Sequence, residues 1–167
     1  RVLSMRLVLD VENTITKRDG KVHLDPFEPD NTLVQVGICN ADKPNQLKIF
    51  NLDHNECKDE TGSRRKQIQK CLDSTKLLIM HNAQHDLMWL WECGFKYDGD
   101  IYDTMLAEYI LDRGQRNPLS LQACAERRQL EVLKDDTLKR YFKEGKNTNE
   151  IPLAELCNYL KHDLLTT

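Results

Sequence analysis

The sequence predicts an α/β domain with a mixed β-sheet, and this prediction rests on the order of apolar patterns along its 167 residues. Short apolar runs typical of strands dominate the first third of the chain. Strand and helix patterns then alternate, and the last part carries helical patterns alone. This order is typical of a sheet with an antiparallel meander at one side and parallel strands at the other.

The first part of the chain supplies the meander. Residues 7–11 form a short apolar run that predicts a buried strand. A hairpin turn is expected at 19–20, where Asp precedes Gly between two polar–apolar segments. Residues 25–31 form a proline-rich loop. Two further strands, expected at 33–39 and 47–52, would pair in the meander.

The second part of the chain alternates between strands and helices and then becomes helical. Residues 60–72 predict a surface helix, because Ile68 and Leu72 share one side and polar or basic residues the other. Residues 77–80 predict another buried strand. Further helices are expected at 86–93, 104–111, 119–128 and 153–165, with a short strand at 100–102.

The composition, 40% hydrophobic and 31% charged residues, fits a soluble globular domain. No apolar run reaches the length of a membrane span. The net charge of −3 argues against a broad duplex-binding module, which is usually basic, but it is compatible with carboxylates gathered around cations. The six cysteines indicate buried thiols in a reducing, intracellular compartment, with a disulfide or zinc site less favoured: Cys39, Cys57, Cys71, Cys93, Cys124 and Cys157.

Asp10 and Glu12 stand at the end of the first predicted strand. Because side chains two positions apart in a strand project from the same face, the two carboxylates converge. Such a pair forms half of a site for a hard cation, since Mg²⁺ and Mn²⁺ prefer oxygen ligands. Taken alone, the pattern is better explained by a pair of solvated acids at a strand end.

Asn82 and Asp86 follow the predicted strand at 77–80, in the place where open α/β sheets bind ligands. The two residues are four positions apart, so a helical turn would put them on a common face. Alternatively, Asn82 caps the helix that ends near Cys93, and Asp86 complements the positive end of the helix dipole. The segment alone favours neither interpretation.

Tyr159 and Asp163 are also one helical turn apart, which places a phenol and a carboxylate on a common face. A tyrosine near a core usually only packs there, so this motif alone is weak. The apolar stripe beside the pair predicts that the helix docks on the sheet through Leu153, Leu156, Leu160 and Leu164.

The three motifs together, D-x-E, N-x-x-x-D and Y-x-x-x-D in this order, resemble those of the DEDD 3′→5′ exonucleases of the tyrosine subtype. Within that group the chain is most similar to the proofreading domains of family A DNA polymerases, those of phages above all. Residues 81–90 resemble the second motif, and residues 102–107 the strand–helix junction that follows it. The chain departs from the family at His85, where an aromatic residue is usual, and at Asn13 and Thr14, where many members have Thr or a small residue after the glutamate. These departures remove no metal ligand, so they bear on substrate binding rather than on catalysis.

The resemblance implies a ribonuclease-H-like mixed β-sheet flanked by helices and a site for two divalent cations, Mg²⁺ or Mn²⁺. Asp10, Glu12 and Asp163 would hold the first cation. Asp10 would bridge to the second cation, whose water shell Asp86 would order. Glu12 and Tyr159 would orient the attacking water for an in-line displacement at the phosphodiester.

The resemblance also implies that Asn82 supports the site by hydrogen bonding. Carboxylates with two metals leave no room for a paired base, so we expect the substrate to be a single-stranded or frayed DNA 3′ end. Asn13, Thr14 and Ile15 are the candidates for contacting the terminal nucleotide, because the strand end after Glu12 faces the same cleft. Residues 1–167 would form one 3′→5′ exonuclease domain, the N-terminal part of a longer DNA polymerase whose polymerase domain is in the same chain. Such an enzyme would work in the cytoplasm, without a membrane partner.

Two other functions fit the same motifs. A free-standing RNA exonuclease similar to ribonuclease D uses the same four carboxylates on a phosphodiester common to DNA and RNA. A catalytically silent exonuclease-like domain would only bind a nucleic-acid strand or a protein partner. The presence of all four carboxylates and the tyrosine counts against this last alternative.

Three further features receive a structural interpretation. Asp103 is expected to cap a helix rather than to bind metal. Trp89 and Trp91 are expected to pack, because their helix needs an apolar face. Arg113 and Arg116 are solvated charges by default, although their place in a loop would allow phosphate contacts.

Overall fold

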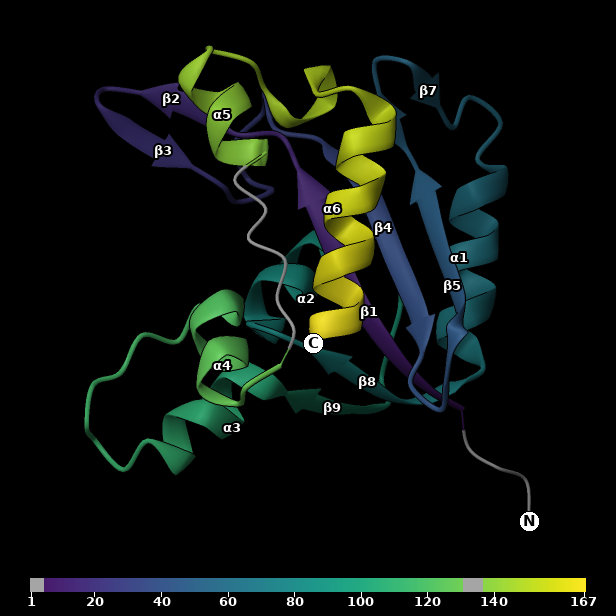
Figure 1. Ribbon diagram of the computed structural model, residues 1–167. Helices are drawn as coiled ribbons and strands as arrows, with labels where there is room; N and C mark the ends of the chain where they lie inside the picture. Colours follow the sequence, from purple (N-terminus) through teal and green to yellow (C-terminus); the bar gives the residue numbers. More distant parts are fainter. Residues whose placement is uncertain (1–4, 131–136) are drawn as a thin grey trace.

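A five-stranded mixed sheet forms the centre of the molecule, as a computed structural model that describes residues 5–130 and 137–167 shows (Figure 1). Its strands lie in the order β5 (Lys43–Asn51), β4 (Leu33–Asn40), β1 (Met5–Asn13), β8 (Thr75–Met80) and β9 (Asp100–Asp103). The β5–β4 and β4–β1 pairs are antiparallel, and the β1–β8 and β8–β9 pairs are parallel. The predicted arrangement, a meander at one side and parallel strands at the other, is confirmed.

Two small hairpins extend from the sheet. The strands β2 (Thr16–Arg18) and β3 (Lys21–His23) are joined by the predicted turn at Asp19 and Gly20. Both turn residues have positive φ, 52° and 73°, which matches the right-handed twist of a two-residue hairpin. The second hairpin, β6 (Asp53–His54) and β7 (Cys57–Lys58), was not predicted, because two-residue strands carry no periodic pattern.

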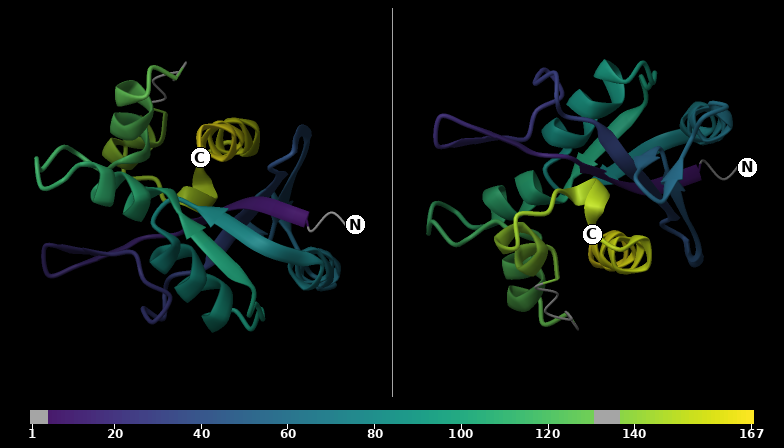
Figure 2. Two further views of the ribbon diagram at one scale, coloured as in Figure 1. Left: turned by 90° about the horizontal axis from the view of Figure 1, so that it is seen from below. Right: turned by 90° about the horizontal axis from the view of Figure 1, so that it is seen from above.

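Helices cover the two faces of the sheet. In the views along the sheet, α6 (Leu153–Thr166) lies on one face, while α1 (Ser63–Asp73) and α2 (Ala83–Glu92) lie on the other (Figure 2). Next to β9 lie α3 (Thr104–Leu111) and α4 (Leu121–Arg127) (Figure 1). All five helices were predicted within a few residues of these bounds. The first begins at Ser63 rather than at residue 60, because Gly62 takes a left-handed conformation just before it.

The larger core fills the space between the sheet and helices α1 and α2. It includes Leu9, Leu78 and Trp89, and the Trp89 indole nitrogen donates to the Leu24 carbonyl at 3.1 Å. Trp91 is 55% exposed, so the prediction that both tryptophans pack is wrong for this residue. Two positions along a helix turn a side chain by more than half a revolution, so the two rings cannot share a face.

A smaller core lies beneath α6 on the opposite face. Leu160 and Leu164 of the helix pack on Val8 of β1 and Cys39 of β4. This contact confirms that the leucine stripe docks the helix on the sheet, and it places the polar residues of the same helix at the edge of the packed surface.

Two short elements before α6 were not predicted. The helix α5 (Thr137–Lys143) packs through Leu138 and Tyr141 on Leu156. The 3₁₀ turn η1 (Thr148–Glu150) begins with a capping box, in which Asn147 and Glu150 satisfy each other's backbone N–H groups. The 3₁₀ turn is too short to show a helical period in the sequence.

All six cysteines are free thiols, and Cys39 and Cys124 are buried. Within residues 5–130 and 137–167, no helix combines the length and the apolar character that a membrane span needs.

Candidate metal centre

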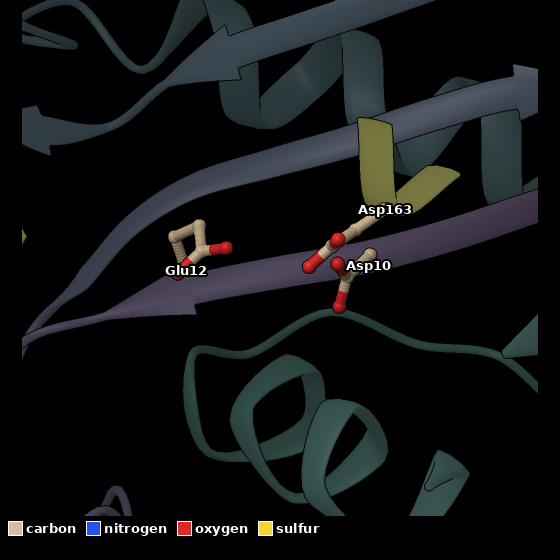
Figure 3. A group of neighbouring side chains, drawn as sticks. All are labelled: Asp10, Glu12 and Asp163. Carbon is tan, nitrogen blue, oxygen red and sulfur yellow. The ribbon is translucent and has the colours of Figure 1, made fainter. Parts of the chain in front are cut away.

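Three carboxylates from the two ends of the chain meet at one point (Figure 3). Asp10 and Glu12 project from β1, and Asp163 projects from the last turns of α6. Each residue offers one oxygen, and these three oxygens lie within 4.8 Å of one another. The sequence prediction that these residues form one group is reproduced by this geometry.

The electrostatics of the cluster favour a bound cation. Burial and the neighbouring Asp163 charge raise the pKa of Asp10 from its ordinary 3.8 to about 7. Burial, followed by the charges of Asp10 and Asp163, raises the pKa of Glu12 well above its usual range. In the part of the chain that the structure describes, no Lys, Arg or His forms an ion pair with Asp10 or Glu12. Buried carboxylates that cluster in this way suit an added proton or a metal ion.

Asp86 adjoins this cluster from the first turn of α2 and is only 2% exposed. Burial, followed by the charge of Asp10, raises its pKa well above the usual value for an aspartate. Asp86 and Asp10 both interact with the backbone N–H of Val11, which donates to Asp10 Oδ1 at 3.0 Å. Asp86 is not one of the three carboxylates that lie within 4.8 Å of one another, and the neighbour whose charge affects it most is Asp10.

Tyr159 lies one turn before Asp163 on α6 and is half-buried. Burial and the charges of Asp163 and Glu12 raise the pKa of its phenol far above the ordinary value, and Asp163 is its hydrogen-bond partner. The phenol therefore stays protonated and acts as a donor at the edge of the cluster. Its ring also packs against the core beneath α5 and α6.

Asn82 does not share a helical face with Asp86, so that prediction is wrong. The helix begins at Ala83, and Asn82 precedes it in a left-handed conformation with φ of 69°. Its side chain is exposed and does not cap the helix. The backbone N–H groups of Asn82 and Ala83 donate instead to the Asp103 carboxylate, at 3.0 and 2.9 Å.

Asp103 was correctly predicted to cap a helix, but its wider role was missed. One carboxylate oxygen accepts from the N–H groups of Met105 and Leu106 in α3. The same carboxylate accepts from the N–H groups of Ala83, the first residue of α2, and of Asn82, which precedes it. The parallel pairing of Met80 with Asp103 brings the two helix starts together. This pairing has no local signal in the sequence, so the double cap could not be predicted.

The residues expected to contact the terminal nucleotide follow directly after Glu12. The Asn13 amide donates to the Leu24 carbonyl at 3.1 Å and pairs with His85 Nε2 at 2.9 Å. The Thr14 hydroxyl accepts from the Thr32 N–H at 2.7 Å. Both side chains are buried. The polar groups of these side chains thus hold the strand end in place, and their role in substrate binding stays a prediction.

Ile15 completes this segment and is fixed through its backbone. Its N–H donates to Asn147 Oδ1 at 2.9 Å, and its carbonyl accepts from Asn147 Nδ2 at 2.8 Å. The Ile15 side chain is half-buried. Contact between Ile15 and a nucleotide likewise stays a prediction.

Gln35 is a neighbour of the site that sequence reasoning missed. It lies directly opposite Glu12 in the pairing of β1 with β4 and is fully buried. Its amide nitrogen donates to Asn51 Oδ1 at 2.6 Å, while its Oε1 lacks a hydrogen-bond partner among the described residues. The register of the meander places it there, and a single sequence does not reveal that register.

The donor set fits a hard divalent cation. All the converging groups are carboxylates, which are the ligands that Mg²⁺ and Mn²⁺ prefer. Asp10, Glu12 and Asp163 would hold the ion, and Asp86 would act from beside Asp10.

The chain belongs to the 3′–5′ exonuclease family. The model of this family matches residues 24–167, the larger part of the sequence. The matched part contains Asp86, Tyr159 and Asp163, whereas Asp10 and Glu12 precede it. Comparison of the sequence with curated proteins gave no match.

Solved structures share the fold at low sequence identity. Phi29 DNA polymerase complexed with primer-template DNA and incoming nucleotide substrates superposes with a TM-score of 0.56 at 19% identity, over 98% of this chain and 30% of that one. The same polymerase complexed with single-stranded DNA superposes with a TM-score of 0.55 at 19% identity, over 97% of this chain and 29% of that one. NrnC of Brucella melitensis, with bound Mg²⁺, superposes with a TM-score of 0.51 at 17% identity, over 96% of this chain and 73% of that one. The chain thus spans under a third of the polymerase, and these matches establish the expected ribonuclease-H-like fold.

Proposed function

We propose that the chain hydrolyses DNA from its 3′ end with the help of two divalent cations, Mg²⁺ or Mn²⁺, and that it serves as the proofreading domain of a DNA polymerase. The observation that carries the proposal is the convergence of the Asp10, Glu12 and Asp163 carboxylates, whose oxygens lie within 4.8 Å of one another, in a chain of the 3′–5′ exonuclease family. Asp86 and Tyr159 stand beside this cluster from two different helices.

Each carboxylate has a distinct place in the proposal. Asp10, Glu12 and Asp163 hold one cation, and Asp10 together with Asp86 serves the second. When bound, such ions stabilise the negative charge that develops on a phosphodiester and make a water molecule more nucleophilic. The carboxylates fix where that charge stabilisation acts, because they are held by β1, α2 and α6.

Glu12 and Tyr159 orient the attacking water. The high pKa of the phenol supports a role as hydrogen-bond donor rather than as base. Glu12 projects from β1 (Figure 3), whereas Tyr159 belongs to α6, so the two residues would approach the reacting phosphate from different elements. A positioned donor of this kind contributes by orientation and by charge stabilisation.

The preference for a polymerase domain rests on two observations. Residues 81–90 and 102–107 resemble the corresponding segments of polymerase proofreading domains, and Phi29 DNA polymerase shares the fold over nearly the whole chain. In this proposal, residues 1–167 are one exonuclease domain, its partner is a polymerase domain in the same chain, and the free thiols suit a cytoplasmic location. Single-stranded DNA is bound by that polymerase in one of its solved structures.

A free-standing exonuclease that acts on RNA, similar to ribonuclease D, is the second candidate. It is favoured by one observation, the match to NrnC, because the chain covers 73% of that protein but only 30% of the polymerase.

Initial rates on four 5′-labelled substrates at one salt concentration separate these functions. The substrates are a DNA single strand, a matched duplex, a duplex with a 3′ mismatch and an RNA strand. A proofreading domain should degrade the single strand fastest and the mismatched end faster than the matched end, because unpairing a mismatched end costs less free energy. Equal rates on the three DNA substrates would contradict proofreading. Faster degradation of RNA would favour the free-standing enzyme, and no hydrolysis with Mn²⁺ would indicate a silent domain.

A further inference from the structure

Gly37 lies in the middle of β4, directly opposite Asp10 in the pairing with β1. Residues directly opposite in an antiparallel pair point to the same face of the sheet. A side chain at Gly37 would therefore point to the face that carries Asp10 and Glu12, which is the face that α6 covers (Figure 1).

The helix leaves no room for such a side chain. A Cβ atom on Gly37 would lie 2.6 Å from Leu164 Cδ1 and 3.0 Å from Leu160 Cγ. Non-bonded carbon atoms ordinarily stay about 3.5–4.0 Å apart, so a methyl group would displace the helix or its leucines by about 1 Å. Leu160 and Leu164 are 0% and 2% exposed, and they are enclosed by the small core beneath α6, so they have little freedom to turn aside.

The glycine is not required by its backbone conformation. The glycines with positive φ are Gly20, Gly62, Gly94, Gly114 and Gly145, and Gly37 is not among them. Alanine can adopt extended backbone angles without strain. What Gly37 uniquely provides is space, so an effect of alanine at this position would arise from the contact with α6.

The leucines above Gly37 flank the acidic residue of the same helix. Leu164 follows Asp163 directly, and Leu160 follows Tyr159 directly. Because a helix moves as a unit over so short a distance, lifting these leucines also lifts Asp163 and Tyr159 away from Asp10. Magnesium sites require oxygens at about 2.0–2.1 Å in a near-octahedral arrangement, so a shift of this size weakens coordination.

We propose that Gly37 is a positioning residue of the metal centre: the space that it leaves beneath Leu160 and Leu164 sets the height of α6 at which Asp163 joins Asp10 and Glu12. The inference rests on the proposed function, since it presumes that these carboxylates hold a cation. It adds a residue that carries no metal-binding group and that no motif marks.

The test measures Mn²⁺ dissociation constants by titration calorimetry for the unmodified chain and for Gly37→Ala, with thermal unfolding in the absence of metal. Gly37→Ala should weaken Mn²⁺ binding about tenfold, as changes beside metal ligands typically do. The double variant with Leu164→Ala removes Leu164 Cδ1, the atom that the new methyl group meets most closely, and leaves the looser contact with Leu160. It should therefore recover part of the affinity, although it unfolds at a lower temperature. Ile38→Ala is the matched control, because Ile38 is the next residue of β4 and packs in the core on the opposite face. It should lower stability and leave Mn²⁺ affinity unchanged.

Folded Gly37→Ala protein with unaltered Mn²⁺ affinity would overturn the inference, and so would an affinity loss that Leu164→Ala fails to restore. If Gly37→Ala alone does not fold, the double variant decides: folded protein that binds Mn²⁺ supports the inference, and folded protein that does not bind contradicts it. If the unmodified chain neither binds Mn²⁺ nor degrades DNA, the proposed function is wrong, and the inference about Gly37 is wrong with it. That outcome is seen in the unmodified chain alone, so it is distinguishable from a failure that only the Gly37 variants reveal.

Discussion

Asp10 on β1 and Asp163 on α6 present carboxylate oxygens within 4.8 Å of each other, although they come from opposite ends of the sequence. Two like charges at this separation repel each other, and burial adds to the cost of ionising both. The folded chain tolerates this arrangement because Leu160 and Leu164 dock α6 on the sheet beside it. The electrostatic cost of this arrangement is the physical argument for the proposed metal site.

Neutralising either aspartate should abolish most turnover while leaving the fold intact. Asp10→Asn and Asp163→Asn keep the size of the side chain and remove the charge that would hold a cation. Because such electrostatic contributions are large in water-poor sites, the rate should fall by roughly 10²-fold or more. Rates of nucleotide release from single-stranded DNA with Mn²⁺ measure the effect.

Asp42→Asn is the matched control for these two variants. Asp42 pairs with Arg6 at the opposite end of β1, on the surface. Its replacement should leave turnover unchanged. A similar loss of activity in this control would show that general damage, rather than loss of a metal ligand, explains the effect.

Without metal, the protein should become less stable as the pH rises. A carboxyl group whose pKa is raised on folding stabilises the folded state while it is protonated. For Asp10 this contribution is complete below the ordinary pKa of 3.8 and is lost as the pH rises through about 7. The pKa values of Glu12 and Asp86 are also raised, so these two residues contribute in the same direction. The melting temperature in chelator should therefore be higher at about pH 5 than at about pH 8.

Two comparisons test whether the acidic cluster causes this dependence. Asp10→Asn should flatten the decline of melting temperature with pH, because it removes one titrating group and one repelling charge. Mg²⁺ should raise the melting temperature at high pH more than at low pH, since the ion binds the ionised carboxylates. A decline that neither change affects would assign the pH dependence to other groups.

Tyr159→Phe should separate the phenol's orienting role from its packing. The substitution keeps the ring in the core beneath α5 and α6 and deletes one hydroxyl group. If that hydroxyl positions the nucleophile, kcat should fall by roughly 10²-fold. The melting temperature should change little, and unchanged kcat would reduce Tyr159 to a packing residue.

Asp103→Ala should destabilise the chain, because it leaves the starts of both α2 and α3 uncapped. Four backbone N–H groups lose their acceptor. One lost cap costs about 1 kcal/mol, so the free energy of unfolding in urea should drop by about 2 kcal/mol. A smaller loss, no larger than that of one cap, would mean that only one helix depends on this carboxylate.

The sequence predicted the parts of the fold that repeat a pattern. The apolar run at 7–11 and the leucine stripe of α6 repeat with the periods of a strand and a helix, and both were located correctly. The short elements η1, β6 and β7 carry no such period. Trp91 was misassigned because its helix exposes the face opposite Trp89.

For the site, the sequence motifs identified the charged residues but not the uncharged residues that pack beside them. Asp10, Glu12 and Asp163 were found because the three motifs together, in this order, resemble those of a known exonuclease family, although each motif alone is weak. Gly37 and Gln35 owe their places to the register between β1 and β4, which depends on pairing between distant segments. Such pairing leaves no mark in one sequence, so residues that act through it become visible only in the structure.

The direction of DNA hydrolysis and its dependence on a divalent cation distinguish a metal-dependent 3′→5′ exonuclease from other nucleases. Single-stranded DNA labelled at the 5′ end is incubated with the unmodified chain and Mn²⁺, with chelator in place of Mn²⁺, and with the Asp10→Asn variant. We expect labelled strands that shorten one nucleotide at a time from the 3′ end, and only in the reaction that contains both the unmodified chain and Mn²⁺. Immediate release of the labelled 5′ nucleotide, or an equal ladder of products from the Asp10→Asn variant, would contradict the proposed function.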